Sequence, residues 1–105
     1  MKKYRIQLTP IAECDITAIG DYIAYGVSSP RISNKLIKSI SKSIKSLKIF
    51  PYKYSLVQNV QLSANGIRCM PVKNYYVFYK ISEEKQIIII LRIGHKRRDW
   101  KDILK

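Results

Sequence analysis

The sequence predicts an α+β fold: an N-terminal strand, then a two-helix antiparallel hairpin packed on a mainly antiparallel four-stranded sheet. Two observations predict it. Apolar residues recur at helical spacing in the first half of the chain, and the spacing changes to alternation after Gly66. The 105 residues suit a single domain, spanning residues 1–105, with a core of its own.

A Thr-Pro pair separates the first strand from the first helix. Residues Tyr4–Leu8 alternate between apolar and polar side chains, as in a half-buried strand. Thr9 is the expected N-cap, Pro10 the first helical residue, and Gly26 the stop. Asp15, in an early turn, is expected to interact favourably with the helix dipole. The expected buried stripe comprises Ala12, Ile16, Ile19 and Ile23.

A second helix is expected between the pair Ser29-Pro30 and Pro51, which ends the pattern. Its apolar face comprises Ile32, Leu36, Ile37, Ile40, Ile44 and Leu47. The opposite face carries a narrow stripe of lysines, namely Lys35, Lys38, Lys42 and Lys45. A solvated helix face is the plainer interpretation of this stripe, and contact with the phosphates of ribosomal RNA or DNA is the alternative. The short connection makes the two helices an antiparallel hairpin.

Three strands are expected in the second half. The segment from Tyr52 to Gly66 is predicted to be mostly loop, in which Tyr54–Leu56 or Val60–Leu62 can pair briefly. The strands that follow are Ile67–Val72, Tyr75–Ile81 and Ile87–Ile93. The last is the most hydrophobic and should be central, and Gly94 closes it. The tail is basic and then weakly helical, with Trp100 anchoring it on the sheet.

The charge of the chain is strongly unbalanced. Twenty Lys and Arg stand against seven Asp and Glu, a net charge of +13. No acidic residue occurs from Tyr22 through Ser82. Such a surface repels itself and indicates an anionic counterpart, which can be nucleic acid, a membrane or an acidic protein. A surface that only confers solubility is the plainer alternative.

The cysteines and the hydropathy indicate which kinds of site and which cellular location are expected. Cys14 and Cys69 are expected to be reduced core residues of a cytoplasmic protein. They and the single histidine lack the spacing of zinc ligands, so neither a metal nor a cofactor is expected. No segment approaches the roughly 18 apolar residues of a membrane span, and no apolar run follows the N-terminal lysines as in a signal peptide. The protein is therefore expected in the cytoplasm, without a membrane partner.

Three segments resemble the RelE/ParE superfamily of toxins. One is Leu8-Thr9-Pro10 with Ala12-Glu13, another is GIRCMPVKNYYVFY from Gly66 to Tyr79, and the third is LRIGHKRRDW from Leu91 to Trp100. The resemblance covers nearly the whole chain. It implies the toxin component of a type II toxin–antitoxin (plasmid stabilisation) system, which is neutralised by a cognate antitoxin. That antitoxin should be acidic, partly disordered until bound, and joined to the toxin in a hetero-oligomer.

The superfamily has two branches with different targets. ParE-like members inhibit DNA gyrase, and RelE-like members cleave messenger RNA in the ribosomal A site. Metal-independent cleavage needs a proton acceptor, a cation beside the phosphorane and a proton donor. In the RelE-like case the resemblance assigns these catalytic roles to His95, Arg97 and Arg68.

This chain departs from the RelE-like pattern at two places. Tyr76 stands where RelE-like proteins carry a catalytic Arg, and the C-terminal Tyr of some members has no counterpart. These departures favour ParE-like inhibition of gyrase slightly. A ribosome-dependent endonuclease is the alternative, and a non-toxic basic nucleic-acid-binding module is a second one.

The remaining candidate residues are binding residues. Those expected to contact the target are Arg68, Lys73, Lys96, Arg97 and Arg98. Those expected to face the antitoxin are Tyr76, Phe78 and Trp100. The plainer alternatives are an idle loop histidine, surface ion pairs worth about 0–1 kcal/mol, and tyrosines that pack in the core. The functional interpretation requires Arg68, His95, Arg97 and Arg98 to share one exposed face.

Overall fold

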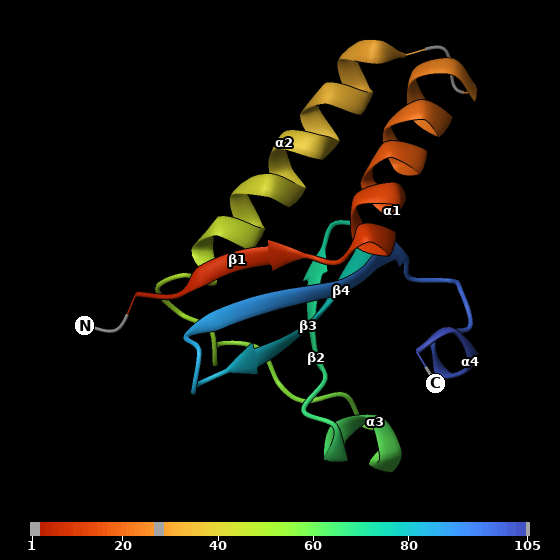
Figure 1. Ribbon diagram of the computed structural model, residues 1–105. Coiled ribbons are helices and arrows are strands. Elements are labelled where there is room, and N and C mark those ends of the chain that lie inside the picture. The colour runs from red at the N-terminus through yellow and green to blue at the C-terminus, as the bar shows by residue number, and fades with distance from the viewer. Residues whose placement is uncertain (1–2, 27–28, 105) are drawn as a thin grey trace.

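The computed structural model describes residues 3–26 and 29–104. Its sheet has four strands in the order β1-β4-β3-β2 (Figure 1). β1 (Arg5–Leu8) runs parallel to β4 (Ile87–His95), whereas β3 (Tyr75–Ser82) is antiparallel both to β4 and to β2 (Arg68–Val72). The predicted α+β fold is confirmed, and β4 is central as its hydrophobicity required. None of the helices in the described ranges is long and apolar enough to cross a lipid bilayer.

Two capped helices form the hairpin. α1 (Pro10–Asp21) continues into the π-helical turn η1 (Tyr22–Gly26), so the helical segment ends at the predicted glycine. α2 (Pro30–Ser46) follows. The hydroxyls of Thr9 and Ser29 each accept a hydrogen bond from the backbone N–H three residues on, at 3.1 and 3.4 Å. Both predicted N-caps are therefore confirmed.

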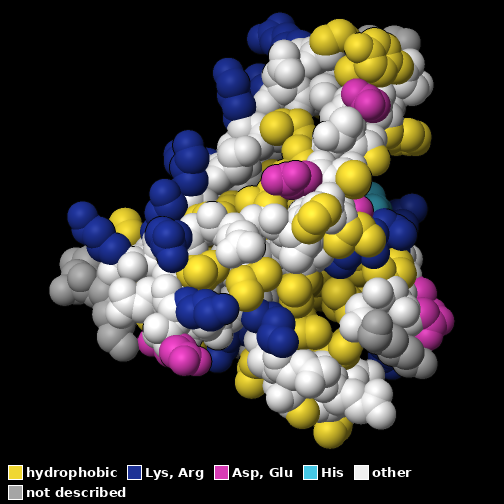
Figure 2. All heavy atoms as spheres, in the orientation of Figure 1, with side chains coloured by type: hydrophobic (Ala, Val, Ile, Leu, Met, Phe, Trp, Pro, Cys, Tyr) yellow, Lys and Arg dark blue, Asp and Glu magenta, His cyan; other side chains and the backbone are white. Residues whose placement is uncertain are grey.

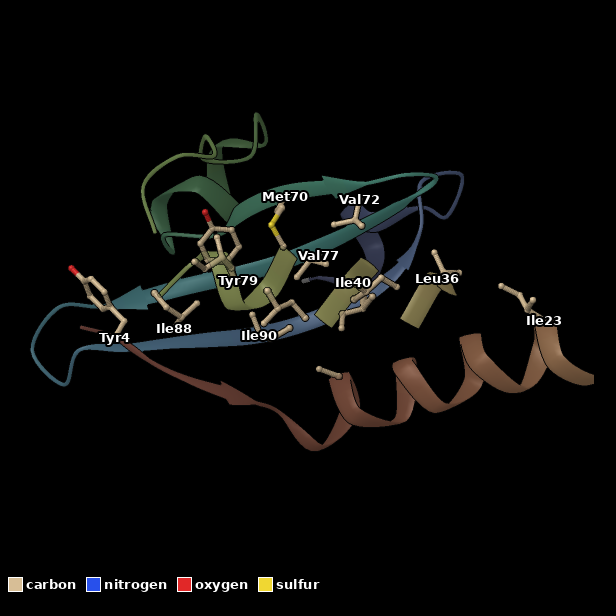
Figure 3. Packing of buried hydrophobic residues seen from close by; sticks show 14 residues of the cluster. Tyr4, Ile23, Leu36, Ile40, Met70, Val72, Val77, Tyr79, Ile88 and Ile90 are labelled. Carbon is tan, nitrogen blue, oxygen red and sulfur yellow. The ribbon is translucent and has the colours of Figure 1, made fainter. Parts of the chain in front are cut away.

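The main core lies between the hairpin and one face of the sheet (Figure 3). Its largest fully buried side chains are Ile40, Leu47, Met70, Val77, Tyr79, Ile88, Ile90 and Ile93. The outer turns of both helices extend beyond the sheet (Figure 1). Ile32 lies there and is 55% exposed, so the expectation that α2 buries it is wrong, because the sheet does not reach that end of the hairpin.

A smaller apolar cluster covers part of the opposite face of the sheet. It contains Leu62, Ile67, Phe78 and Trp100. Trp100 begins α4 (Trp100–Ile103) and packs on Phe78 with the ring centroids 4.7 Å apart. The prediction that Trp100 anchors the tail is confirmed.

The segment between α2 and β2 is only partly the predicted loop. It contains α3 (Val60–Ala64), which Asn59 caps. The brief strand pairing expected for Val60–Leu62 is therefore wrong. Pairing does occur in the earlier stretch, where Leu56 forms an isolated bridge with Arg68.

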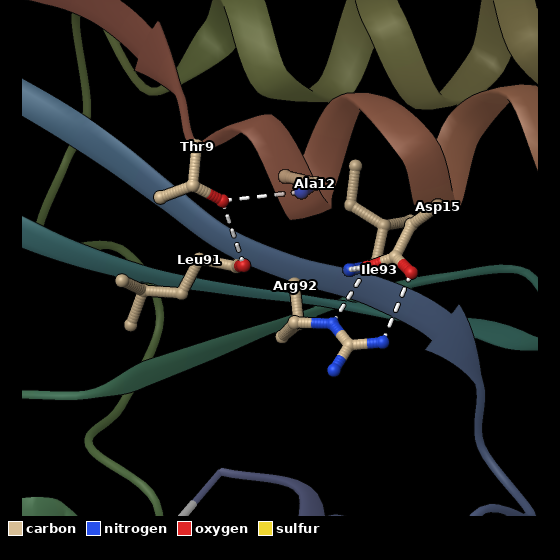
Figure 4. A network of polar contacts seen from close by, with 6 residues as sticks. All are labelled: Thr9, Ala12, Asp15, Leu91, Arg92 and Ile93. Carbon is tan, nitrogen blue, oxygen red and sulfur yellow. Dashed lines mark hydrogen bonds and ion pairs between the residues drawn. The ribbon is translucent and has the colours of Figure 1, made fainter.

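α1 closes the edge of β4 that β1 leaves open (Figure 4). β1 pairs only with residues 87–90 of β4. Thr9 then donates from its backbone N to Ile90 O at 3.1 Å and from Oγ1 to Leu91 O at 3.0 Å. Farther along α1, Asp15 Oδ2 accepts a hydrogen bond from the backbone N of Ile93 at 2.9 Å. Side chains of α1 thus satisfy polar backbone groups that would otherwise need another strand.

Asp15 also forms a bidentate ion pair with Arg92. Nε and Nη2 of the guanidinium lie 2.8 and 3.0 Å from the two carboxylate oxygens, and the Asp15 side chain is only 10% exposed. A β-bulge at Leu91 shifts the register between β3 and β4 just before this pair. The hydrogen bond to the Asp15 carboxylate raises the pKa of Arg92, which stays charged. Asp15 therefore acts mainly on β4 rather than on the dipole of its own helix.

We expect Asp15→Ala to lower the free energy of unfolding by about 3 kcal/mol, because it leaves a largely buried guanidinium and a backbone N–H without their partner. Urea denaturation followed by circular dichroism measures the change. Glu13→Ala, on the exposed side of α1, is the control and should stay within about 0.5 kcal/mol. A loss below about 1 kcal/mol for Asp15→Ala would contradict the role given to this carboxylate.

Candidate functional site

Four of the predicted binding cations lie together at the C-terminal end of β4. Lys96, Arg97 and Arg98 follow the strand directly, and Lys73 lies in the turn between β2 and β3 with a φ of 54°. The backbone N of Lys96 donates to Asn74 O at 3.0 Å and thereby joins the tail to that turn. All four side chains are exposed. We name these four residues the basic end.

His95 shapes the start of the tail. Its Nδ1 accepts a hydrogen bond from the backbone N of Arg97 at 3.1 Å, and its carbonyl accepts one from Trp100 Nε1 at 3.0 Å. Its ring meets Tyr75 edge-on, with the centroids 5.5 Å apart. Because Nδ1 is an acceptor here, the proton of the neutral ring belongs on Nε2. His95 therefore positions the backbone of Arg97.

Aromatic rings support two cations of the basic end. Lys96 Nζ lies 5.4 Å from the centroid of the Tyr76 ring, and Arg98 Cζ lies 5.2 Å from that of Trp100. Such contacts contribute about 0.5–1 kcal/mol each at exposed sites and restrict where the charges can lie. Gly94 does not close β4 as expected, since the strand runs on to His95. A Cβ at Gly94 would lie 2.6 Å from the Trp100 ring, so this glycine admits the ring against the strand.

Arg68 is not part of this group. It pairs with Tyr79 on one side of β3, whereas His95 pairs with Tyr75 on the other side. Four residues of β3 separate the two positions, about 13 Å along the strand, and β3 itself lies between them. Both positions point to the same face of the sheet, because Tyr75 and Tyr79 are four residues apart. Arg68 is half-buried, however, and lies too far along β3 to join the exposed residues at the end of β4. The strand of Arg68 could be predicted from the sequence, but the register that separates it from His95 could not.

Arg68 instead holds the segment that follows α2. Its Nη1 donates to Tyr54 O at 2.7 Å, and its guanidinium lies 4.9 Å from the centroid of the Tyr52 ring. The Tyr79 hydroxyl donates to Pro51 O at 2.8 Å in the same place. Burial raises the pKa of Tyr79 to about 12, so this donor keeps its proton. These contacts give Arg68 a structural role.

The three residues expected to face the antitoxin lie on the sheet face opposite the hairpin. Phe78 and Trp100 are 3% and 8% exposed, because the tail and sheet cover them, whereas Tyr76 is half-buried. Beside Tyr76 is a hollow of about 470 Å³ between α3, α4 and the sheet. Its apolar lining includes Leu56, Val57, Leu62, Cys69, Phe78 and Trp100. Figure 2 shows hydrophobic side chains in this region of the surface.

Sequence reasoning missed two residues that position the basic end. Asn74 receives the hydrogen bond from Lys96, and Tyr75 contacts the ring of His95. The short turn before a strand of aromatic residues was the available signal for both. Their contacts come from the pairing of β3 with β4, which the sequence alone did not fix.

The sequence matches the model of a family described as the ParE toxin of the type II toxin–antitoxin system parDE, over residues 6–100. The chain belongs to the ParE toxin family. It is therefore a toxin of the type II toxin–antitoxin class. No curated protein matches the sequence at a significant level.

Solved structures share the fold of this ParE-family toxin. A chain from the chromosomal ParDE toxin–antitoxin system of P. aeruginosa superposes with a TM-score of 0.74 at 18% identity, covering 90% of this chain and 98% of that one. A chain from the RelBE2 toxin–antitoxin complex of Mycobacterium tuberculosis superposes with a TM-score of 0.63 at 19% identity, covering 90% and 99%. At these identities the likeness concerns the fold alone.

The two cysteines of the ParE-family chain lie in different surroundings. Cys14 is exposed on α1, so the expectation that it packs in the core is wrong. Cys69 is half-buried in the hollow beside Tyr76, and burial raises the pKa of its thiol to about 11 although Lys96 opposes the shift. Cys69 is therefore a weak nucleophile at neutral pH.

We expect a maleimide at pH 8 to modify Cys14 rapidly and Cys69 slowly, because a thiol of pKa about 11 is ionised to about one part in a thousand at that pH. Mass spectrometry with time should show one adduct first and a second one much later. In urea both thiols should react at similar rates. Two adducts that form together on the folded protein would contradict the burial of Cys69.

Proposed function

We propose that this toxin inhibits DNA gyrase through a direct, non-catalytic contact made by the basic end. The observation that carries the proposal is the offset of Arg68 from His95 along β3, together with the contacts that its guanidinium makes to Tyr54 and Tyr52. This arrangement disfavours a common catalytic role for Arg68, His95 and Arg97. Tyr76 stands where RelE-like proteins carry a catalytic Arg, and its ring makes a cation–π contact with Lys96. The chain matches the ParE toxin family over residues 6–100, and the ParE-like branch is the one whose members inhibit gyrase.

The basic end has the properties of a protein-binding surface of high association rate. Its two arginines and two lysines are exposed, and aromatic rings support Lys96 and Arg98. Arginine and aromatic residues dominate the energetics of protein interfaces. A net charge of +13 also accelerates encounter with an acidic surface.

The partner that neutralises this toxin is an acidic antitoxin. Its charge would complement the basic end, and an apolar side chain of the antitoxin would enter the hollow beside Tyr76, whose floor is Phe78 and Trp100. The hollow and the basic end adjoin, since Lys96 lies over the Tyr76 ring. One antitoxin segment can therefore cover both.

We expect the triple substitution Lys96→Gln, Arg97→Gln and Arg98→Gln to raise the concentration for half-inhibition of gyrase supercoiling at least tenfold, which corresponds to about 1.4 kcal/mol of lost binding. The control replaces Lys3, Lys53 and Lys85, which are exposed elsewhere, with Gln, so that the net charge matches. It should inhibit like the parent chain. If both variants lost inhibition equally, the overall charge of the protein and not the basic end would account for inhibition, and the proposal would be overturned.

His95→Asn distinguishes inhibition by binding from RNA cleavage in the same experiment. Asparagine can still accept the hydrogen bond from Arg97 N but cannot exchange a proton near neutral pH. On induced expression the variant should still cause elongated cells and a DNA-damage response. If cells that express the parent chain contained cut messages, and cells that express His95→Asn did not, the protein would be a nuclease instead. Normal growth of cells that express the parent chain would indicate a non-toxic binding module.

We expect Tyr76→Ala to weaken binding of the cognate antitoxin at least tenfold, because it removes the exposed wall of the hollow and the ring under Lys96. Calorimetric titration of toxin with antitoxin measures this. Phe50→Ala, at an exposed aromatic residue just after α2, is the control and should bind as before. Unchanged affinity of Tyr76→Ala would place the antitoxin elsewhere.

A further inference from the structure

The outer face of α2 carries a row of five exposed cations that the proposed function does not use. They are Arg31, Lys35, Lys38, Lys42 and Lys45, at successive spacings of four, three, four and three residues. At about 100° per residue they fall within an arc of about 80°. The buried residues Leu36, Ile40 and Ile44 lie on the opposite side of the helix, against the sheet. Figure 2 shows Lys and Arg side chains gathered along this outer flank of the helix.

The acidic residues of α1, the helix packed beside α2, do not neutralise this row. The acidic residues of the neighbouring helix point elsewhere. Asp15 binds Arg92, while Glu13 and Asp21 line a shallow surface depression on α1 itself. Like charges three or four residues apart on a helix destabilise it by a few tenths of a kcal/mol per pair. An external anion would therefore offset the repulsion within the row.

The residues around the row favour phosphate over the other anionic partners. Ser39, Ser46 and Asn34 flank it, and the exposed Ile32 lies about 100° round the helix. Protein interfaces are depleted in lysine at their centres and rich in aromatic residues, which the row lacks. A helix that binds a bilayer inserts an apolar face, but the apolar face of α2 is already buried in the core. Lys, Arg, Ser and Asn are the side chains that contact nucleic-acid phosphates.

We propose that the outer face of α2 binds the phosphate backbone of duplex DNA without reading its sequence. From Arg31 to Lys45 the row is about 21 Å long, roughly the rise of six base pairs. A straight, rigid row of this length suits a stiff duplex. α2 contains no aromatic residue from Pro30 to Ser46, which disfavours single strands, whose bases stack on aromatic rings. The choice of DNA over RNA rests on the proposed function, because gyrase holds duplex DNA.

The row and the basic end are separate surfaces. The row lies on the outside of the hairpin, and the basic end lies where β4 leaves the sheet (Figure 1). The toxin can therefore contact DNA through α2 while the basic end contacts a protein that is bound to the same DNA. Binding to DNA alone tests the row without any contribution from gyrase.

The experiment measures the affinity of the full chain for a fluorescent 24-base-pair DNA of arbitrary sequence, by anisotropy, between 50 and 200 mM KCl. Replacement of Lys35, Lys38, Lys42 and Lys45 with Gln should reduce the slope of log affinity against log salt by about three to four. The matched control replaces Lys3, Lys53, Lys85 and Lys101, which are exposed outside the row, with Gln and keeps the same net charge. Its slope should change by less than about one. The four Lys→Arg changes in the row should preserve the slope.

Three results would overturn the proposal. An unchanged slope in the row variant would mean that α2 does not bind DNA. This conclusion would hold even if the row variant no longer bound the antitoxin. Equal losses in the row variant and the control would mean that overall charge, not the row, binds DNA. Tighter binding to an RNA duplex of the same length would assign the row to RNA. Gyrase inhibition by the row variant is measured separately, so a failure here does not count against the basic end.

Discussion

β4 has a partner strand along its whole length on the side of β3, but on its other side β1 accompanies only residues 87–90. Beyond that point α1 takes the place of a strand. The Thr9 hydroxyl serves twice, as acceptor for the first turn of α1 and as donor to Leu91 O. Asp15 then accepts three hydrogen bonds, two from Arg92 and one from the backbone of Ile93. A helix can serve as the neighbour of a strand only when its side chains satisfy polar groups in this way.

The direction of the tail depends on this attachment. Ile93, held by Asp15, is followed at once by Gly94, which admits the Trp100 ring, and by His95, whose backbone carbonyl accepts from Trp100 Nε1. The ring of Trp100 in turn supports Arg98. The cations of the tail are therefore positioned by a chain of contacts that begins on α1. Because the backbone of the tail is held in one position, the flexible side chains attached to it are restricted to one region of the surface.

More of the fold than of the candidate site could be predicted from the sequence. Caps, helical stripes and strand alternation are local signals, and they placed Thr9, Ser29 and the order of the four strands and the two hairpin helices correctly, although not α3. Errors arose where an answer depends on which elements meet. Cys14 and Ile32 are apolar residues at helical spacing, yet neither lies over the sheet.

Arg68 shows the same limit for function. The resemblance to RelE-like proteins assigns it a catalytic role, but in the folded chain it contacts Tyr54 and Tyr52. Register follows from pairing between distant segments, and a single sequence does not specify it when several shifts keep the same face buried. The pairing of β3 with β4 likewise brings Lys96 to the β2–β3 turn, where its backbone N donates to Asn74 O next to Lys73.

The parallel pairing of β1 with β4 has a consequence for how the protein is made. The hydrogen bonds that attach α1 to β4 join residues 77 to 82 positions apart, and Arg5 pairs with Ile87. An emerging polypeptide cannot form them until the last strand has left the ribosome, and loop closure over such lengths adds to the delay. Nascent or prematurely terminated chains consequently lack the arrangement that gives the finished toxin its surfaces. The finished fold thus forms only after β4 has been made, which gives an antitoxin already present in the cell time to meet each new molecule as it folds.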